Sequence, residues 1–259
     1  MNIRGIAAIT FGVALMPAVG GNSHAAEVKV FGSYAVKTVL EALGPLFEEA
    51  TGNKVTFVYG SVAELKTDIE KGAAFDVAVL TAVGVADLVK QGRISASAQA
   101  NLARSGVGIA IKKGAAKTDI CTTDAFKHAL LNAKSIGFVE QSPTGIYLKN
   151  LFPRLGIADE LKSKIKFIDA KVGAGGAVAS GEVEIGLTQI GEILPHAGAE
   201  LLGPLPKDIQ VYTNYAAGVS ANSKEANAAS ALIKFMATPA FAKVIKEKGL
   251  EPRSDNSVN

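Results

Sequence analysis

The chain has 259 residues, of which 48% are apolar and 20% are charged, and its formal net charge is +3. That length allows one large domain or two small ones, and the apolar fraction is sufficient for a packed core. The small net charge, together with the lack of a basic stripe with interleaved aromatic residues, argues against a nucleic-acid partner.

The first 25 residues have the pattern of a secretory signal peptide. Arg4 supplies a short positive start, residues 6–19 form an apolar run, and small residues at Ser23 and Ala25 stand where a signal peptidase cleaves. The apolar run is too short for a membrane span, although an uncleaved anchor is the alternative. We therefore expect a soluble periplasmic protein that begins near Ala26 and has no membrane span after cleavage.

Few residues of the types that hold metals or attack substrates follow this segment. Cys121 is the single cysteine, so an internal disulfide is excluded, and His128 and His196 are the two remaining histidines. A lone cysteine among apolar residues is expected to be buried and inert. No cluster of His, Cys and Asp has the spacing of metal ligands, so we expect neither a bound metal nor a cofactor.

Short apolar strands alternate with amphipathic helices in the first part of the chain. The hydrophobic pattern predicts strands at 28–31, 55–59 and 75–80, and helices at 37–49, 63–71 and 85–90. Pro45 after Gly44 predicts a kink or a break in the first helix. Val55, Phe57 and Tyr59 are expected to lie on one face of their strand.

The same alternation continues to the C-terminus. It predicts strands at 106–111, 135–139, 165–169, 183–188 and 210–215, and helices at 124–132, 145–154, 173–180, 224–236 and 239–248. Alternating strands and helices are typical of an α/β fold, in which a mainly parallel sheet carries helices on both faces.

Two extended apolar stretches, near 104–111 and 211–221, are expected to carry the chain between two lobes. Lobe 1 would then consist of 26–104 and 217–259, and lobe 2 of 105–216. Two crossing strands form a hinge, and two open sheets that face each other leave a cleft at the carboxyl ends of their strands.

Small, polar or glycine residues occupy five of the predicted strand-to-helix junctions, at 32–34, 60–61, 141–145, 173–176 and 188–189. Helix N-termini present unpaired N–H groups and partial positive charge, and so bind anions without a lysine or arginine. Helix capping explains any single junction, whereas five at one edge favour a ligand site. The candidate ligand-binding residues are Ser33, Tyr34, Ser61, Thr144, Gly145, Val172 and Gln189.

Several stretches of the chain resemble one family of proteins. They read VKVFGSY from Val28, FEEATGNKV from Phe47, FDVAVL from Phe75, SPTGIY from Ser142 and SGEVEIG from Ser180, with FMATPAF and KGLEP near the end. On these stretches the chain resembles the periplasmic solute-binding proteins of the molybdate-binding type. The resemblance implies a two-lobed, type II-like fold, a small anionic ligand, and delivery to the permease of an ABC importer. We expect a monomer.

The ligand shell of the molybdate binders does not carry over intact. Ala35, Val62 and Gln189 stand where that family has two serines and a tyrosine, so only the neighbouring hydroxyls of Ser33 and Ser61 remain. The stretches QIGEILP from position 189 and GPLPKDIQ from position 203 resemble a divergent branch, which is also similar to an exported aconitate isomerase.

Two functions from different classes therefore remain open. The first is a binding protein for an oxyanion or a small carboxylate, which needs only hydrogen-bond donors and a hinge. The second is an isomerase that interconverts trans- and cis-aconitate, which needs a general base to move a proton between carbons. The candidates for that base are Glu64, Glu140 and Tyr34, although a helix cap, solvent exposure and simple packing are the respective alternatives.

Overall fold

The structure, a computed structural model, describes residues 25–253. The predicted signal peptide lies outside the described residues, apart from Ala25.

The first half of the described chain begins in one sheet and ends in a long strand. Its elements are β1 (Glu27–Ser33), η1 (Tyr34–Val36), α1 (Lys37–Thr51), β2 (Lys54–Gly60), α2 (Val62–Glu70), β3 (Val77–Thr81), α3 (Ala82–Lys90) and β4 (Ile94–Lys112).

The second half builds another group of strands and then returns to the first. Its elements are α4 (Thr123–Asn132), β5 (Ile136–Phe138), α5 (Pro143–Arg154), α6 (Ala158–Leu161), β6 (Ile165–Phe167), α7 (Gly173–Ser180), β7 (Ile185–Gln189), α8 (Ile190–Ile193), β8 (Ala199–Pro204), η2 (Lys207–Ile209), β9 (Tyr212–Ser220), α9 (Ala226–Met236), η3 (Pro239–Phe241), α10 (Ala242–Glu247) and β10 (Glu251–Pro252).

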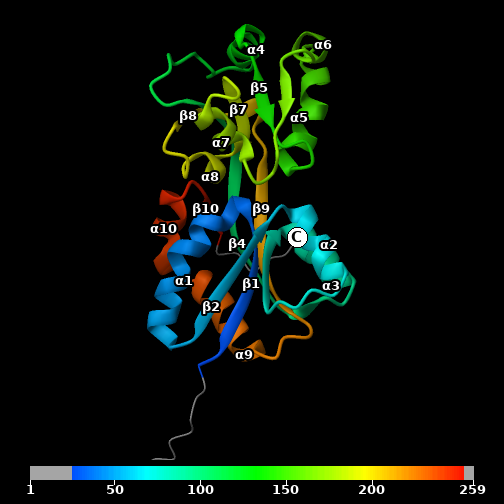
Figure 1. The fold of residues 1–259 in the computed structure, drawn as a ribbon, viewed down its shortest axis with the longest axis vertical. Coiled ribbons are helices and arrows are strands. Elements are labelled where there is room, and N and C mark those ends of the chain that lie inside the picture. The colour runs from blue at the N-terminus through cyan, green and yellow to red at the C-terminus, as the bar shows by residue number, and fades with distance from the viewer. Residues whose placement is uncertain (1–24, 254–259) are drawn as a thin grey trace, which may run out of the picture.

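The strands follow the order β2-β1-β3-β9-β4-β7-β5-β6. Parallel pairs occupy the outer part of each half, where β1 pairs with β2 and β3, and β5 pairs with β6 and β7. The strands β4 and β9 run antiparallel to their neighbours. Figure 1 shows the two halves one above the other, with β4 and β9 passing between them.

The long strand β4 belongs to both halves. It pairs with β9 up to the partners Gly106 and Tyr212, and with β7 from the partners Val107 and Gln189 onward. The strand therefore changes partners between residues 106 and 107, where the chain passes from one half to the other.

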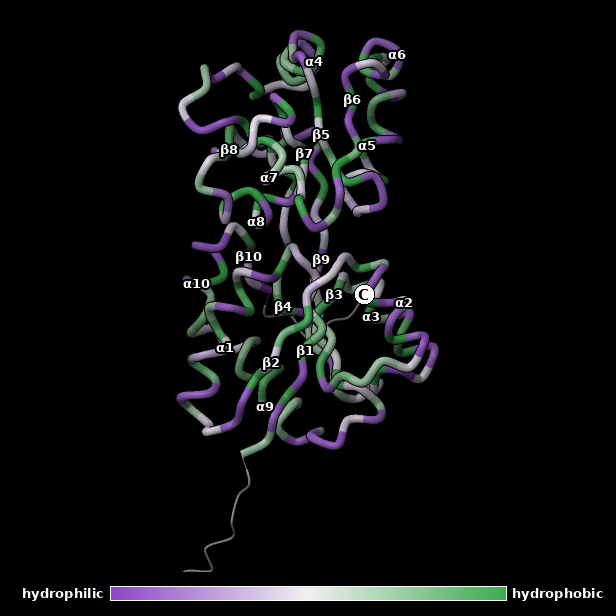
Figure 2. The backbone as a smooth tube through the Cα atoms, viewed as in Figure 1, coloured by the Kyte–Doolittle hydropathy of each residue, from purple (hydrophilic) through white to green (hydrophobic). Residues whose placement is uncertain are grey.

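Helices cover both faces of each half. In the lower half of Figure 1, residues of α1, α9 and α10 pack on one face of the sheet, and residues of α2 and α3 pack on the other. In the upper half, α4 and α5 cover one face, while α7 covers the other with Ile193 of α8. Hydrophobic stretches follow the central strands, and hydrophilic ones gather in the outer loops (Figure 2). The expected α/β fold with helices on both faces is thus confirmed.

Most predicted elements are present, and the first helix departs from its prediction. Of the kink or break expected at Gly44 and Pro45, the break is wrong, because α1 continues from Lys37 to Thr51 with Pro45 inside it. Pro45 lies on the exposed side of the helix, so water can pair the carbonyl that it leaves without a donor. Val55, Phe57 and Tyr59 share one face and pack against the same cluster, as predicted.

The largest differences concern strands without a clear apolar pattern. The predicted strand at 106–111 is only the end of the 19-residue β4, whose first part contains many serines, alanines and polar residues. The strand expected at 210–215 is β9, which runs from Tyr212 to Ser220, and β8 and β10 had no counterpart in the prediction. In these segments the strand pairing, rather than the side-chain pattern, holds the extended backbone.

Two further points concern the surface. Cys121 was expected to be buried, and this is wrong, because it is exposed in the loop before α4. A hydrogen bond to Asp119 and the charge of that carboxylate raise the pKa of its thiol. Among the described residues, no single helix is long and apolar enough to cross a membrane. Helix α9 and the segment Pro239–Glu247 together have the length and composition of a membrane span, but they are bent by 53° relative to each other.

Candidate functional site

A cavity of about 300 Å³ receives residues from both halves of the molecule. Each of the five strand-to-helix junctions singled out in the sequence contributes to its lining. The contributing residues are Ser33, Tyr34, Ser61, Gln141, Ser142, Pro143, Thr144, Gly173 and Gln189. The parallel strands bring these junctions together because their carboxyl ends point toward the boundary between the halves.

Ser33 lies at the end of β1 and is 3% exposed. Although it precedes the short helix η1, its side chain makes no capping hydrogen bond. Its Oγ has no hydrogen-bond partner among the described residues, and the same holds for Thr38 Oγ1, whose residue also lines the cavity. Buried hydroxyls are normally paired, so these two are available to a ligand.

Gln189 connects three elements at the cavity wall. Its Nε2 donates to Thr144 Oγ1 of α5 at 3.0 Å and to Thr213 Oγ1 of β9 at 3.1 Å. The residue is 3% exposed, and its Oε1 has no partner among the residues described. Because both threonine hydroxyls can donate or accept, the amide can also adopt the flipped orientation. Either orientation leaves one polar end of the buried amide unpaired.

Ser61 and Glu64 form a capping box at the start of α2. The Ser61 Oγ accepts from the Glu64 N–H at 3.2 Å, and the Glu64 carboxylate accepts from the Ser61 N–H at 2.8 Å. These hydrogen bonds from Ser61 lower the pKa of Glu64. Ser61 lines the cavity, but its hydroxyl is already used by the helix.

Gly145 and Glu140 lie behind the lining instead of on it. The Gly145 N–H donates to Ser142 Oγ at 3.0 Å, and a Cβ at Gly145 would meet the Val139 carbonyl oxygen at 2.2 Å. Glycine is therefore required for the close turn into α5. Glu140 forms an ion pair with Lys149 at 3.0 Å. By contrast, Val172 lines the cavity, with 43% of its surface exposed.

The sequence analysis missed Glu192, which is the acidic residue deepest in the site. Glu192 lines the cavity and accepts a hydrogen bond from the Thr188 hydroxyl. Burial raises the pKa of its carboxyl group, against the opposing effect of hydrogen bonds from Thr188 and the Gln189 backbone. The segment QIGEILP was interpreted only as a mark of a divergent branch. A glutamate four residues after the end of the strand predicted at 183–188 was a signal that could have been used.

Other titratable residues also face this space. His196 lines the cavity, and burial followed by the charge of Lys37 lowers its pKa, which favours the neutral imidazole. Tyr215 of β9 is 1% exposed, and burial raises the pKa of its hydroxyl. Positive charge comes from Lys37 at the start of α1 and from Lys171 in the loop before α7.

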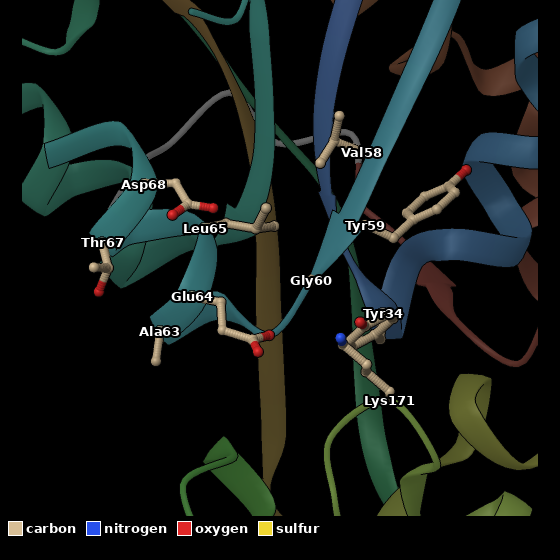
Figure 3. A pocket seen from close by; sticks show the side chains of 10 residues that line it. All are labelled: Tyr34, Val58, Tyr59, Gly60, Ala63, Glu64, Leu65, Thr67, Asp68 and Lys171. Atoms are coloured by element: carbon tan, nitrogen blue, oxygen red, sulfur yellow. The ribbon is translucent and has the colours of Figure 1, made fainter. Parts of the chain in front are cut away.

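A second, more open pocket of about 520 Å³ lies beside the cavity. Figure 3 shows Glu64 and Asp68 of α2 on one side of it, with Tyr34 and Lys171 on the other. Tyr34 and Lys171 line both spaces, so the open pocket adjoins the cavity at these two side chains. Burial and the charges of Glu64 and Asp169 raise the pKa of Tyr34.

Within residues 25–253, no group of three His, Cys, Asp or Glu side chains is arranged to hold a metal ion. The polar side chains that line the cavity instead carry hydroxyls, two amides, two ammonium groups, one imidazole and the carboxyl groups of Glu41 and Glu192. This set can bind an anion by hydrogen bonds and charge, and the Glu192 carboxyl adds a group that can carry a proton.

Comparison with known families agrees with this arrangement of a cavity between two α/β halves. Residues 28–251 match the family described as bacterial extracellular solute-binding protein. The chain belongs to this family.

Two curated relatives bear different names. The chain is 29% identical over 229 residues to an aconitate isomerase of a Pseudomonas species, covering 86% of this chain and 87% of the relative. It is 25% identical over 235 residues to a molybdate-binding protein of Azotobacter vinelandii, covering 88% and 90%. The solved structure of a periplasmic molybdate-binding protein of the latter organism has the same fold, with a TM-score of 0.73, 21% identity, and coverage of 86% of this chain and 98% of that one.

Proposed function

We propose that this chain is a periplasmic solute-binding protein that captures a small carboxylate anion in the cavity between its halves. The observation that carries the proposal is the pair of buried, unpartnered polar groups on Ser33 and Gln189, which line the same cavity. A buried polar group without a partner costs about 1–3 kcal/mol. A ligand that pairs both groups recovers this free energy on binding.

The charge and size of the cavity favour a carboxylate over a compact oxyanion. Lys37 and Lys171 reach the cavity from opposite halves, so an anion between them would interact with both. A volume of about 300 Å³ lies at the lower end of sites for small organic molecules. Ala35 and Val62 also line the cavity, and their apolar side chains suit the carbon skeleton of an organic anion.

Closure of the two lobes belongs to the same proposal. We assign 26–104 with 217–259 to lobe 1 and 105–216 to lobe 2, with hinge crossings near 104–111 and 211–221. The change of strand partners between Gly106 and Val107 supports this division. The closed, ligand-bound monomer would then deliver its anion to the permease of an ABC importer, as the family membership suggests.

A thermal-shift screen of the purified protein tests the proposal. Molybdate, tungstate, sulfate, citrate and both aconitate isomers are compared at equal concentration and ionic strength. A ligand at a hundred times its Kd adds about 2.7 kcal/mol to the free energy of unfolding. We expect stabilisation by citrate or an aconitate, and stabilisation by molybdate or tungstate alone would contradict the assignment of a carboxylate.

A second candidate function is isomerisation of an unsaturated tricarboxylate. The specific observation in its favour is Glu192, a carboxyl group of raised pKa at the cavity wall. Such a group can accept a proton from a methylene carbon while the double bond shifts, and return it to the former vinyl carbon. Glu64 is held in its capping box and Glu140 is paired with Lys149, so neither is as well placed; Tyr34 lines the cavity.

Nuclear magnetic resonance in deuterated water distinguishes the two functions. The protein is incubated with trans-aconitate, and the vinyl and methylene signals are followed with time. The binding function predicts no conversion and no deuterium uptake beyond that of a protein-free sample. Conversion to the cis isomer that is lost in Glu192→Gln would establish the isomerase instead.

A further inference from the structure

The position of Glu192 has a consequence for ligand selection. Its carboxyl group accepts from the Thr188 hydroxyl and from the Gln189 backbone N–H, which fixes it at the cavity wall. Glu192 retains intermediate exposure, and it lines the cavity. A ligand in the cavity would therefore meet this group directly.

Glu192 has no ion-pair partner among residues 25–253, although Lys37 and Lys171 line the same cavity. Burial raises the pKa of its carboxyl group, against the opposing hydrogen bonds from Thr188 and the Gln189 backbone. The nearby α7, which packs against α8, contributes only glycine, alanine, valine and serine side chains. The charged residues of β4 and β8 are Arg104, Lys112 and Glu200. Arg104 pairs with Glu251, Glu200 pairs with Lys117, and Lys112 is exposed at the end of β4.

Other titratable groups line the cavity around it. Tyr215 of β9 lines the cavity, and burial and then the charge of Glu192 raise the pKa of its hydroxyl. His196 lines the cavity four residues after Glu192 in the chain. The remaining ones are Tyr34 of η1, Lys37 and Glu41 of α1, and Lys171 of the loop before α7. Lys37 is paired with Glu41 at 3.8 Å, and Lys171 lowers the pKa of Glu64.

We propose that Glu192 is the specificity-determining acid of the cavity: it keeps a proton and donates a hydrogen bond to a carboxylate oxygen of the bound anion. This inference rests on the proposed binding of a carboxylate. A protonated carboxyl group has an O–H donor that needs an acceptor, and hydrogen bonds of the O–H···O⁻ type are short and about twice as strong as neutral ones. Sulfate is a much weaker base than a carboxylate, so it gains less from the same donor.

The proposal fixes how affinity depends on pH. The bound complex contains the protonated form of Glu192, so the free protein must take up a proton wherever this residue is ionised. Above the pKa of free Glu192, each further pH unit therefore weakens carboxylate binding by about 10-fold. Glutamine at this position keeps an N–H donor without an ionisable proton. The carboxylate affinity of Glu192→Gln should therefore not depend on the protonation of residue 192.

Isothermal titration calorimetry between pH 6.5 and 9 tests the inference. Trans-aconitate, citrate and sulfate are titrated into the wild-type protein, Glu192→Gln, and Glu160→Gln as a matched control on the exposed surface of α6. Above the pKa of free Glu192, we expect carboxylate affinity to fall about 10-fold per pH unit for the wild type and for Glu160→Gln, and to change less than 2-fold for Glu192→Gln. The wild type and Glu160→Gln should bind the carboxylates more tightly than sulfate, and this preference should shrink in Glu192→Gln.

The outcomes separate the inference from the proposed function. If neither carboxylate binds the wild-type protein, the proposed function is wrong, and the role of Glu192 fails with it. If the carboxylates bind but Glu192→Gln keeps the wild-type pH dependence, only the role of Glu192 is overturned. Should Glu192→Gln not fold, wild-type titrations at alkaline pH in two buffers of different ionisation enthalpy decide: uptake of about one proton supports the proposal, and no uptake overturns it.

Discussion

The side chain of Gln210 forms two hydrogen bonds with the backbone of Val107, at the point where β4 changes its strand partners. Gln210 Oε1 accepts from the Val107 N–H at 3.0 Å, and Gln210 Nε2 donates to the Val107 carbonyl oxygen at 2.9 Å. The amide thus takes the place of a neighbouring strand at this residue, and it lies at one of the two proposed hinge crossings.

Removing this amide should loosen the hinge. In Gln210→Leu, the Val107 N–H loses its partner, whereas the Val107 carbonyl keeps the hydrogen bond from the Leu205 N–H at 3.1 Å. We expect amide hydrogen exchange at Val107 to accelerate while exchange in β1 stays unchanged. We also expect ligand dissociation to become faster, because a looser hinge stabilises the closed form less. Hydrogen exchange with mass spectrometry and stopped-flow release provide the measurements, and unchanged exchange at Val107 would argue against the hinge assignment.

Ser33 and Ser61 should respond differently to the loss of their hydroxyls. Ser33→Ala removes an unpartnered group of the cavity, so affinity should fall by about 2- to 13-fold, corresponding to 0.5–1.5 kcal/mol for one hydrogen bond. Ser61→Ala removes a helix cap and should lower the free energy of unfolding by about 0.5–2 kcal/mol. Calorimetry and urea unfolding measure the two effects; full affinity in Ser33→Ala would remove this serine from the site.

Ionisation of Glu192 should destabilise the folded protein at neutral pH. Because its folded-state pKa is raised, the folded protein holds more protons than the unfolded chain between the two pKa values. The free energy of unfolding contributed by this residue therefore decreases as pH rises above about 4.3, the unfolded value for glutamate. Relative to the wild type, Glu192→Gln should gain stability between pH 5 and pH 8 in urea unfolding.

Glu64 provides the opposite case for the same measurement. Its pKa is lowered by the hydrogen bonds from Ser61, so its contribution to stability is present above the unfolded pKa and is lost as pH falls through the folded value. Glu64→Gln should be less stable than the wild type at pH 7 and approach it at low pH. Parallel curves for the two variants would contradict both pKa directions.

Gly145 should not tolerate a side chain. A Cβ at this position would lie 2.2 Å from the Val139 carbonyl oxygen and 2.6 Å from that of Glu140, and both are backbone atoms. We expect Gly145→Ala to lower the melting temperature and to weaken ligand binding, because the turn that carries Thr144 must shift. Gly52→Ala is a control for affinity: its φ of +74° strains an alanine and should lower stability, but its Cβ would meet open space, so ligand binding should not change. Equal stability and affinity in Gly145→Ala would contradict this packing.

Export can be tested directly on cells that make the full chain. The positive start, apolar run and small residues before Ala26 predict cleavage within a residue or two of that position and recovery in the periplasmic fraction. Mass spectrometry of the purified protein reads its N-terminus. An intact Met1 in the membrane fraction would contradict the prediction of a cleaved signal peptide.

The sequence predicted the strands with a continuous apolar pattern and failed where pairing alone holds the strand. The segment Val77–Thr81 is almost fully buried and was recognised from its composition. The first part of β4 has a mixed polar pattern, and its extended backbone depends on β9, which is more than 100 residues away in the sequence. Long-range pairing of this kind leaves no local signal.

The same limit applies to the cavity. Ser33 and Gln189 stood at recognisable junctions between strands and helices, so local reasoning found them. Glu192 was missed because its significance comes from burial, and burial depends on how α7, β4 and β7 pack against α8. The sequence also left it open whether Ser61 serves a ligand or its own helix, and the capping box with Glu64 accounts for its hydroxyl.

Calorimetric titration of the purified protein with trans-aconitate, citrate and molybdate, in one buffer and at one ionic strength, decides whether the cavity binds a carboxylate. A carboxylate that binds in the cavity should give one site per chain, a weaker constant in Ser33→Ala, and a tighter constant than molybdate. Saturable binding of molybdate to one site, with no heat from either carboxylate, would contradict the account.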